Sequence, residues 1–150
     1  MMASIDILAG IIASDGHLAR DRSTIFVKYN IPSGSKSASI EPPDLQILSK
    51  EIDYFKGWVA GDGSVTNDRG RPKIEIWSKS QKMMLWFRQI LSEAKIESQI
   101  FVDKKRDKHI LRIGKKRSIM EFYQKIEIPH PAKKRKLLEL LNKMSWLPSN

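Results

Sequence analysis

The pattern of apolar positions divides the first part of the chain into a helix, a hairpin, a loop and a second helix. Residues 5–14 have the apolar density of a buried helix. Residues 17–31 predict a hairpin of β-branched and aromatic positions around a polar turn, and 32–43 has the Pro- and Ser-rich composition of a loop. Helical spacing returns over 44–62, where Asp44 is the expected N-cap.

An alternating segment follows the second helix. In residues 73–78, Ile74 and Ile76 face one way, whereas Lys73, Glu75 and Trp77 face the other. This pattern is typical of a half-buried antiparallel strand with one apolar face and one open face.

The rest of the chain predicts helices that enclose a second pair of strands. A helix is expected over 80–94, and two short strands lie within 97–114 around a charged turn. A capping box of Ser118 and Glu121 marks the start of the next helix, and 131–144 is a final amphipathic helix. Trp58, Trp86 and Phe87 are interpreted as core residues.

A nine-residue segment occurs twice in the chain. "LAGIIASDG" at 8–16 and "FKGWVAGDG" at 55–63 share Gly, Ala, Asp and Gly at the third, sixth, eighth and ninth places. Small residues allow two helices to pack closer than the usual ~8–10 Å, here around a pseudo-twofold axis. The small residues at this expected helix interface are Gly10, Ala13, Gly57, Ala60 and Gly61.

Each repeated segment ends in Asp-Gly, so Asp15 and Asp62 are expected to emerge side by side at one end of the helix pair. The glycines are expected to end the helices in the left-handed conformation. Two neighbouring carboxylates repel unless a cation joins them, and oxygen ligands suit Mg²⁺. Carboxylate-bound Mg²⁺ beneath a basic surface is suited to phosphodiester hydrolysis. The alternative is that Asp-Gly serves twice only as a helix stop.

The charge distribution favours a polyanionic partner, with nucleic acid first. The formal net charge is +10, and all of the excess lies in residues 51–150. The chain has no cysteine, which excludes thiolate zinc sites and fits a reducing cytoplasmic or organellar interior. No apolar run approaches the ~20 residues of a membrane span, and the first residues do not have the pattern of a secretion signal.

The two repeated segments, together with "IGKKRSIMEFYQKIEIPHPAKKRKLLELL" at 113–141, resemble the LAGLIDADG homing endonucleases. The resemblance implies an α+β fold of αββαββα repeats, with paired motif helices and a curved antiparallel DNA-binding sheet. It divides the chain into a truncated first half, 1–43, and a complete second half, 44–150. It also implies an intron-encoded type of hydrolase, a Mg²⁺-dependent double-strand DNA endonuclease. Asp15 and Asp62 would hold the metal, one per half-site, and Lys79 would lie near the scissile phosphate.

The first repeat departs from this pattern. Asn30 stands at the position aligned with Lys79, and only 46 residues separate Asp15 from Asp62. Three interpretations follow: a minimal enzyme, a homodimer that completes its own sheet, or a decayed relative that cuts poorly. A cleavage-deficient relative would act as a DNA-binding protein or an RNA-binding intron maturase. A further alternative is a small basic RNA-associated protein whose repeat is only structural.

The expected DNA surface is the open face of the strands together with their turns. Hairpin ribbons fit the major groove, although most basic residues contact phosphate. The segment "AKKRK" at 132–136 is interpreted as helix surface, and the three histidines receive no role. The expected DNA-contacting residues are Arg69, Arg71, Lys73, Glu75, Trp77, Lys104, Lys105, Arg106, Lys108 and Arg112.

Overall fold

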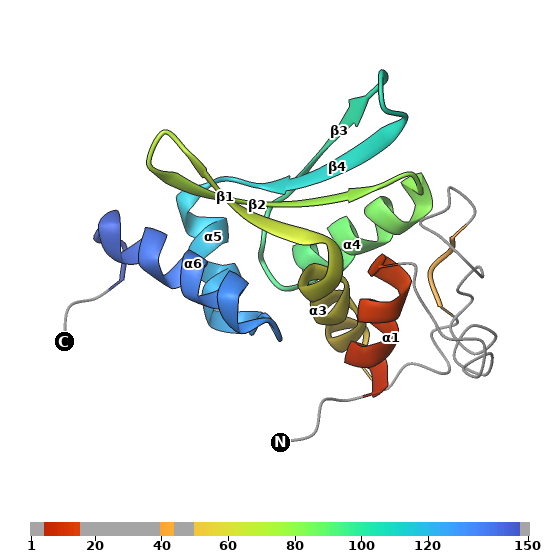
Figure 1. Cartoon of the computed structure of the whole chain (residues 1–150), viewed down its shortest axis with the longest axis horizontal. Coiled ribbons are helices and arrows are strands. Elements are labelled where there is room, and N and C mark those ends of the chain that lie inside the picture. The colour runs from red at the N-terminus through yellow and green to blue at the C-terminus, as the bar shows by residue number, and fades with distance from the viewer. Residues whose placement is uncertain (1–4, 16–39, 44–49, 148–150) are drawn as a thin grey trace.

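The computed structural model of the protein describes residues 5–15, 40–43 and 50–147. Its elements follow the order predicted from the sequence for residues 53–143 (Figure 1). The predicted hairpin at 17–31 and the N-cap at Asp44 lie outside the described residues. The elements are α1 (Ile5–Asp15), α3 (Glu51–Asp62), β1 (Gly63–Asp68), β2 (Arg71–Ser78), α4 (Gln81–Glu93), β3 (Gln99–Asp103), β4 (Lys108–Ile113), α5 (Lys116–Lys125) and α6 (Pro131–Lys143).

The four strands form one antiparallel sheet in the order β1-β2-β4-β3. Ile74 and Ile76 of β2 are buried, whereas Lys73, Glu75 and Trp77 are only partly buried, which confirms the alternation read from the sequence. The helices lie on the side of the sheet that buries the isoleucines (Figure 1). The hairpins rise at both ends of the opposite, open face, so this face is concave.

Aromatic side chains from three helices fill the core beneath the sheet. The Phe55 ring lies 5.1 Å from the Phe87 ring, and the Trp58 ring lies 5.2 Å from Phe87, both in edge-to-face arrangements. Phe122 of α5 completes the cluster at 6.5 Å from Phe55. Trp58 and Phe87 are buried, and Trp86 is a partly buried residue that packs against them. No helix in the described part of the chain is long and apolar enough to cross a membrane.

The predicted capping box at Ser118 and Glu121 is wrong. Helix α5 begins at Lys116, so Ser118 lies inside the helix, where it is buried. Its hydroxyl accepts a hydrogen bond of 3.0 Å from the backbone N–H of Glu97, in the loop before β3. Glu121 pairs instead with Lys125 at 2.7 Å. The Ser118 hydroxyl bonds to Glu97 instead of capping its own helix, because an unpaired backbone N–H beside the core is costly.

Candidate metal and nucleic-acid site

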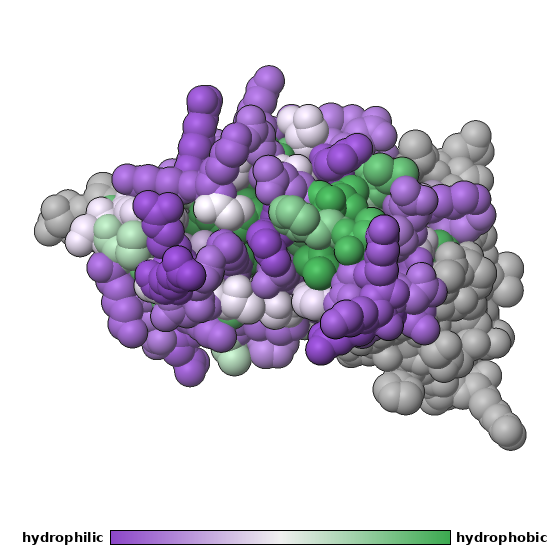
Figure 2. Space-filling view, turned by 90° about the horizontal axis from the view of Figure 1, so that it is seen from above, coloured by the Kyte–Doolittle hydropathy of each residue, from purple (hydrophilic) through white to green (hydrophobic). Residues whose placement is uncertain are grey.

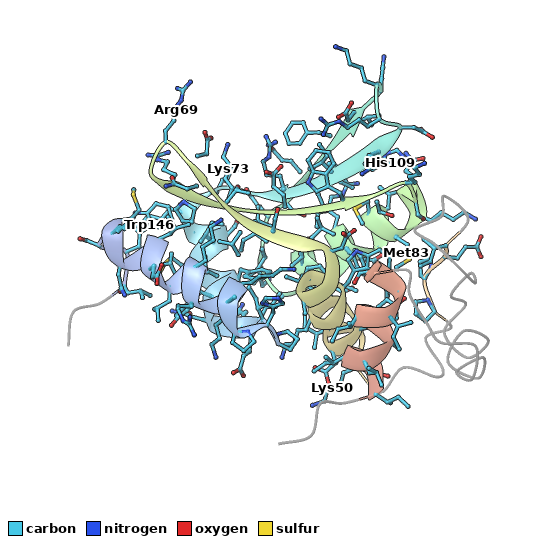
Figure 3. The ribbon with its side chains drawn as sticks, in the orientation of Figure 1. Lys50, Arg69, Lys73, Met83, His109 and Trp146 are labelled. Carbon is cyan, nitrogen blue, oxygen red and sulfur yellow. The ribbon has the colours of Figure 1, made fainter. Side chains whose placement is uncertain are left out.

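The site begins with two parallel helices in direct contact. The N-termini of α1 and α3 lie together, because the Lys50 N–H, at the N-cap of α3, donates to the buried Asp6 carboxylate of α1 at 2.8 Å. Figure 3 shows Lys50 at the end of the pair that is remote from the sheet. Both helices therefore run toward the sheet (Figure 1).

The close approach of the two helices requires glycine at the contact. A Cβ atom on Gly57 would lie 2.8 Å from the carbonyl carbon of Ile7 and 2.9 Å from the nitrogen of Ile11. A Cβ atom on Gly10 would lie 2.8 Å from the nitrogen of Trp58. Real Cβ atoms essentially never approach another atom within 3.0 Å, so any side chain here would push the backbones apart. Ala13 is buried in the same region, and Gly61 is partly buried.

The predicted acids lie at the sheet end of the two helices. Gly10 contacts the helix segment around Gly57, and α1 and α3 each continue five residues further, to Asp15 and Asp62. At a rise of about 1.5 Å per residue, both helices end about 7.5 Å beyond this contact. The Asp62 side chain is partly buried, and the Asp15 side chain lies outside what the structure describes. The backbone thus brings the two positions to one end of the pair.

The glycine after Asp62 serves a different purpose from the one predicted. Gly63 has φ −73° and ψ 151°, which is extended backbone and not the left-handed conformation. A Cβ atom there would lie 2.6 Å from the carbonyl oxygen of Val59. Glycine is needed because β1 leaves the helix so tightly against its last turn. The equivalent Gly16 lies outside the described residues.

A lysine from α6 lies at the carboxyl end of α3. The Lys133 ammonium donates to the carbonyl oxygens of Ala60 at 2.6 Å, Val59 at 3.2 Å and Gly61 at 3.4 Å. The Val59 carbonyl also accepts the N–H of the C-cap residue Gly63. Carbonyls in the last turn of a helix carry the negative end of its dipole, and most have no partner within the helix. Lys133 therefore satisfies the last turn of α3, directly before Asp62.

The sequence interpretation of 132–136 as helix surface is wrong for Lys133. The spacing of Lys133 to Leu137, Leu140 and Leu141 places it on the buried face of α6, and this signal was available in the sequence. His130 also has a structural role that the sequence did not suggest. Its Nδ1 accepts a hydrogen bond of 3.3 Å from the Lys133 N–H and caps the helix.

Lys79 leaves the sheet at the same end as Asp62. Gly63 of β1 is opposite Ile76 of β2, and Lys79 follows Ile76 by three residues. Its side chain is exposed. The aligned position in the first repeat, Asn30, lies outside the described residues.

The described carboxylate at this helix end, that of Asp62, is an oxygen ligand of the kind that a hard divalent ion takes. Mg²⁺ in proteins takes one or two carboxylates and completes its shell with water and substrate phosphate oxygens. The last-turn carbonyls of α3 are already bonded to Lys133, so carboxylates are the ligands that this helix end offers. Within the described residues, no group of three His, Cys, Asp or Glu side chains could hold a metal. A site built from two carboxylates would not contain such a group of three.

The open face of the sheet carries charged side chains held in fixed pairs. Arg112 of β4 donates to the Glu75 carboxylate from Nε at 3.1 Å and from Nη2 at 3.0 Å. Lys73 pairs with Asp68 across the β1–β2 hairpin, and its hydrogen bond lowers the pKa of the Asp68 carboxyl below its usual value. Figure 3 shows Lys73 on this face.

The two hairpin turns present further basic residues. Arg69 and Gly70 both have positive φ, 55° and 87°, as a two-residue type I′ turn requires, and Figure 3 shows Arg69 at the tip. In the β3–β4 turn, the Asp103 carboxylate accepts hydrogen bonds from the N–H groups of Lys105 and Arg106 at 3.1 and 3.2 Å. Arg69, Arg71, Lys104, Lys105 and Arg106 are all exposed.

A family model described as a LAGLIDADG-like domain matches residues 49–127, more than half of the chain. The chain belongs to the LAGLIDADG family. The paired helices and the sheet described above are the parts of the fold that the sequence resemblance implied. No curated protein matches the chain.

Solved structures with TM-scores above 0.5 support the LAGLIDADG fold. The N-terminal LAGLIDADG domain of DUF199/WhiA is 17% identical, with a TM-score of 0.55 over 91% of this chain and 85% of that one. A variant of I-DmoI, solved with its target DNA and Mg, is 15% identical, with a TM-score of 0.51 over 81% of this chain and 93% of that one. A structure of I-DmoI with DNA and Mn is 21% identical, with a TM-score of 0.42. That match covers 50% of this chain and spans 40% of the I-DmoI chain.

Proposed function

We propose that this LAGLIDADG protein is a site-specific double-strand DNA endonuclease of the homing type, dependent on Mg²⁺. The observation that carries the proposal is the common end of α1 and α3, where the helices stop at Asp15 and Asp62. A helix pair with only a structural role does not need an acidic residue at the carboxyl end of each helix. I-DmoI, which has the same fold, was solved with its target DNA and Mg.

Each residue of the proposed site has a separate task. Asp15 and Asp62 hold Mg²⁺, which when bound acidifies a water and neutralises phosphate charge. Lys133 keeps a positive charge at the end of α3 and fixes the turn that carries Asp62. Lys79 is exposed at the same end of the sheet and supplies a cation to the scissile phosphate.

The open face of the sheet binds the duplex in this proposal. Its hairpin ribbons have dimensions that suit the major groove. The basic turn residues contact phosphates and set the register on DNA, whereas Arg112, fixed by Glu75, reads a base edge. Lys73, Lys104, Lys108 and Arg71 add to the electrostatic attraction.

The experiment that tests the function uses a randomised duplex library. The protein binds the library in Ca²⁺, unbound DNA is removed, Mg²⁺ is added, and the released ends are sequenced. Defined ends with a fixed overhang are expected. Asp15→Asn and Asp62→Asn should each abolish cutting while binding in Ca²⁺ remains. Normal double-strand cutting by either variant would contradict the proposal.

A cleavage-deficient protein that binds DNA, or an intron maturase that binds RNA, is the second candidate. The observation that favours it is the length of the first repeat, since 46 residues between Asp15 and Asp62 are too few for a full αββαββα unit. The same library separates the candidates, because an enriched duplex without any cutting identifies a DNA-binding relative. A near-palindromic site would indicate that two copies complete the DNA-binding surface.

A further inference from the structure

The concave face that is proposed to bind DNA also carries apolar side chains. Trp77 of β2 is opposite Ile110 of β4, and Ile110 is opposite Phe101 of β3. Side chains directly opposite in antiparallel strands share a face, so these three form one row across the sheet. Figure 2 looks down on this face and shows a hydrophobic patch enclosed by hydrophilic residues.

The row lies next to the Glu75–Arg112 pair, and a cation lies over each aromatic ring of the row. The Arg112 guanidinium carbon lies 4.8 Å from the centre of the Phe101 ring, and the Lys108 ammonium lies 5.8 Å from the centre of the Trp77 ring. Each cation covers a ring face on which an unpaired base would have to stack. The ring edges remain as the contact surface, and Ile110, only 8% exposed, fills the space between the two rings.

An apolar patch within a basic concave face calls for a partner that is both anionic and locally apolar. Phe101 is 40% exposed, although burying its ring elsewhere in the fold would be favourable. In the major groove of duplex DNA, the thymine C5-methyl is an apolar group among hydrogen-bonding base edges, and phosphates flank it on both sides. The patch and its surrounding cations match that arrangement.

We propose that the row Trp77–Ile110–Phe101 is a specificity element that contacts thymine methyl groups in the major groove of the target. This inference rests on the proposed DNA-binding function and adds the base that this part of the sheet selects. It is independent of cleavage, because the contact is made when the duplex binds.

The test replaces each thymine of the duplex enriched in Ca²⁺ by deoxyuridine, one at a time, and measures Kd. This change removes one methyl group and leaves the Watson–Crick pairing intact. Loss of one buried methyl weakens binding by about fourfold. We expect this loss at one or two thymines of the site, and no loss at the others.

Protein variants assign the effect to the row. Phe101→Ala should bind the thymine duplex more weakly and should no longer distinguish thymine from deoxyuridine at one of those positions. Val102→Ala is the matched control, because Val102 is 58% exposed on the same strand but points to the other face. It should keep the full discrimination. Circular dichroism would verify that both variants fold.

The outcomes separate this inference from the function on which it rests. An enriched duplex that tolerates deoxyuridine at every thymine overturns the inference and leaves DNA binding intact. The inference also fails if Phe101→Ala keeps the discrimination, or if Val102→Ala loses it as well. A library that enriches no duplex, while single-stranded RNA binds tightly, overturns both.

Discussion

Replacing Gly57 by alanine tests the helix contact on which the whole site depends. The new Cβ would lie 2.8 Å from the carbonyl carbon of Ile7 and still closer to the Ile7 oxygen, whereas ordinary contact begins at 3.4 Å. The difference between 2.8 and 3.4 Å means that α1 and α3 must separate by at least 0.6 Å. A gap of about 0.5–1 Å forfeits a quarter to a half of the dispersion energy along the interface.

The expected loss follows from two opposing effects. Overpacking costs about 1–3 kcal/mol, and more where only backbone atoms can move, whereas alanine gains about 1 kcal/mol over glycine in a helix interior. We expect a net loss of about 2 kcal/mol, which lowers the Tm of a chain of this size by about 4–8 °C. Urea unfolding followed by circular dichroism at the helical band measures the difference.

Gly114→Ala is the matched control for this substitution. A Cβ atom on Gly114 meets only the Lys73 side chain, at 3.8 and 3.9 Å, so no backbone has to move. This variant should be neutral, or more stable by up to about 1 kcal/mol through the unfolded state. If Gly57→Ala unfolds at the same urea concentration as the parent protein, the helices are not held at the distance described.

Four further variants, one of them a control, test the contacts around the site. Lys133→Ala should destabilise the protein by about 1–3 kcal/mol in urea unfolding, because carbonyls at the end of α3 lose their donor. The control is Lys134→Ala, which removes an exposed neighbouring lysine and should cost less than about 1 kcal/mol. If the two variants lose the same stability, Lys133 does not cap α3. Asp68→Asn frees Lys73 for phosphate and should steepen the slope of log K against log salt by about 0.9, measured by fluorescence anisotropy. Lys105→Ala should reduce the same slope by about 0.9, and an unchanged slope would remove the β3–β4 turn from the DNA surface.

The alternation typical of strands and the 3.6-residue spacing typical of helices were enough to predict most elements of residues 44–150. The alternation at 73–78 predicted β2 and its open face, and the helix expected over 80–94 is α4. The repeated Gly, Ala and Asp positions indicated paired helices because the helical period of 3.6 places them on one face. The first repeat beyond Asp15 stays a prediction, since residues 16–39 lie outside what the structure describes.

Contacts between distant segments were decided only by the tertiary structure. Lys133 reaches the end of α3 across more than seventy positions of the chain, and Ser118 bonds to Glu97 instead of capping its own helix. The row of Trp77, Ile110 and Phe101 exists only because β4 lies between β2 and β3. Sequence periodicity determines which face of an element is apolar, because that depends on residues a few positions apart. The partners of a buried polar group depend on which elements pack together, and a single sequence does not state that packing.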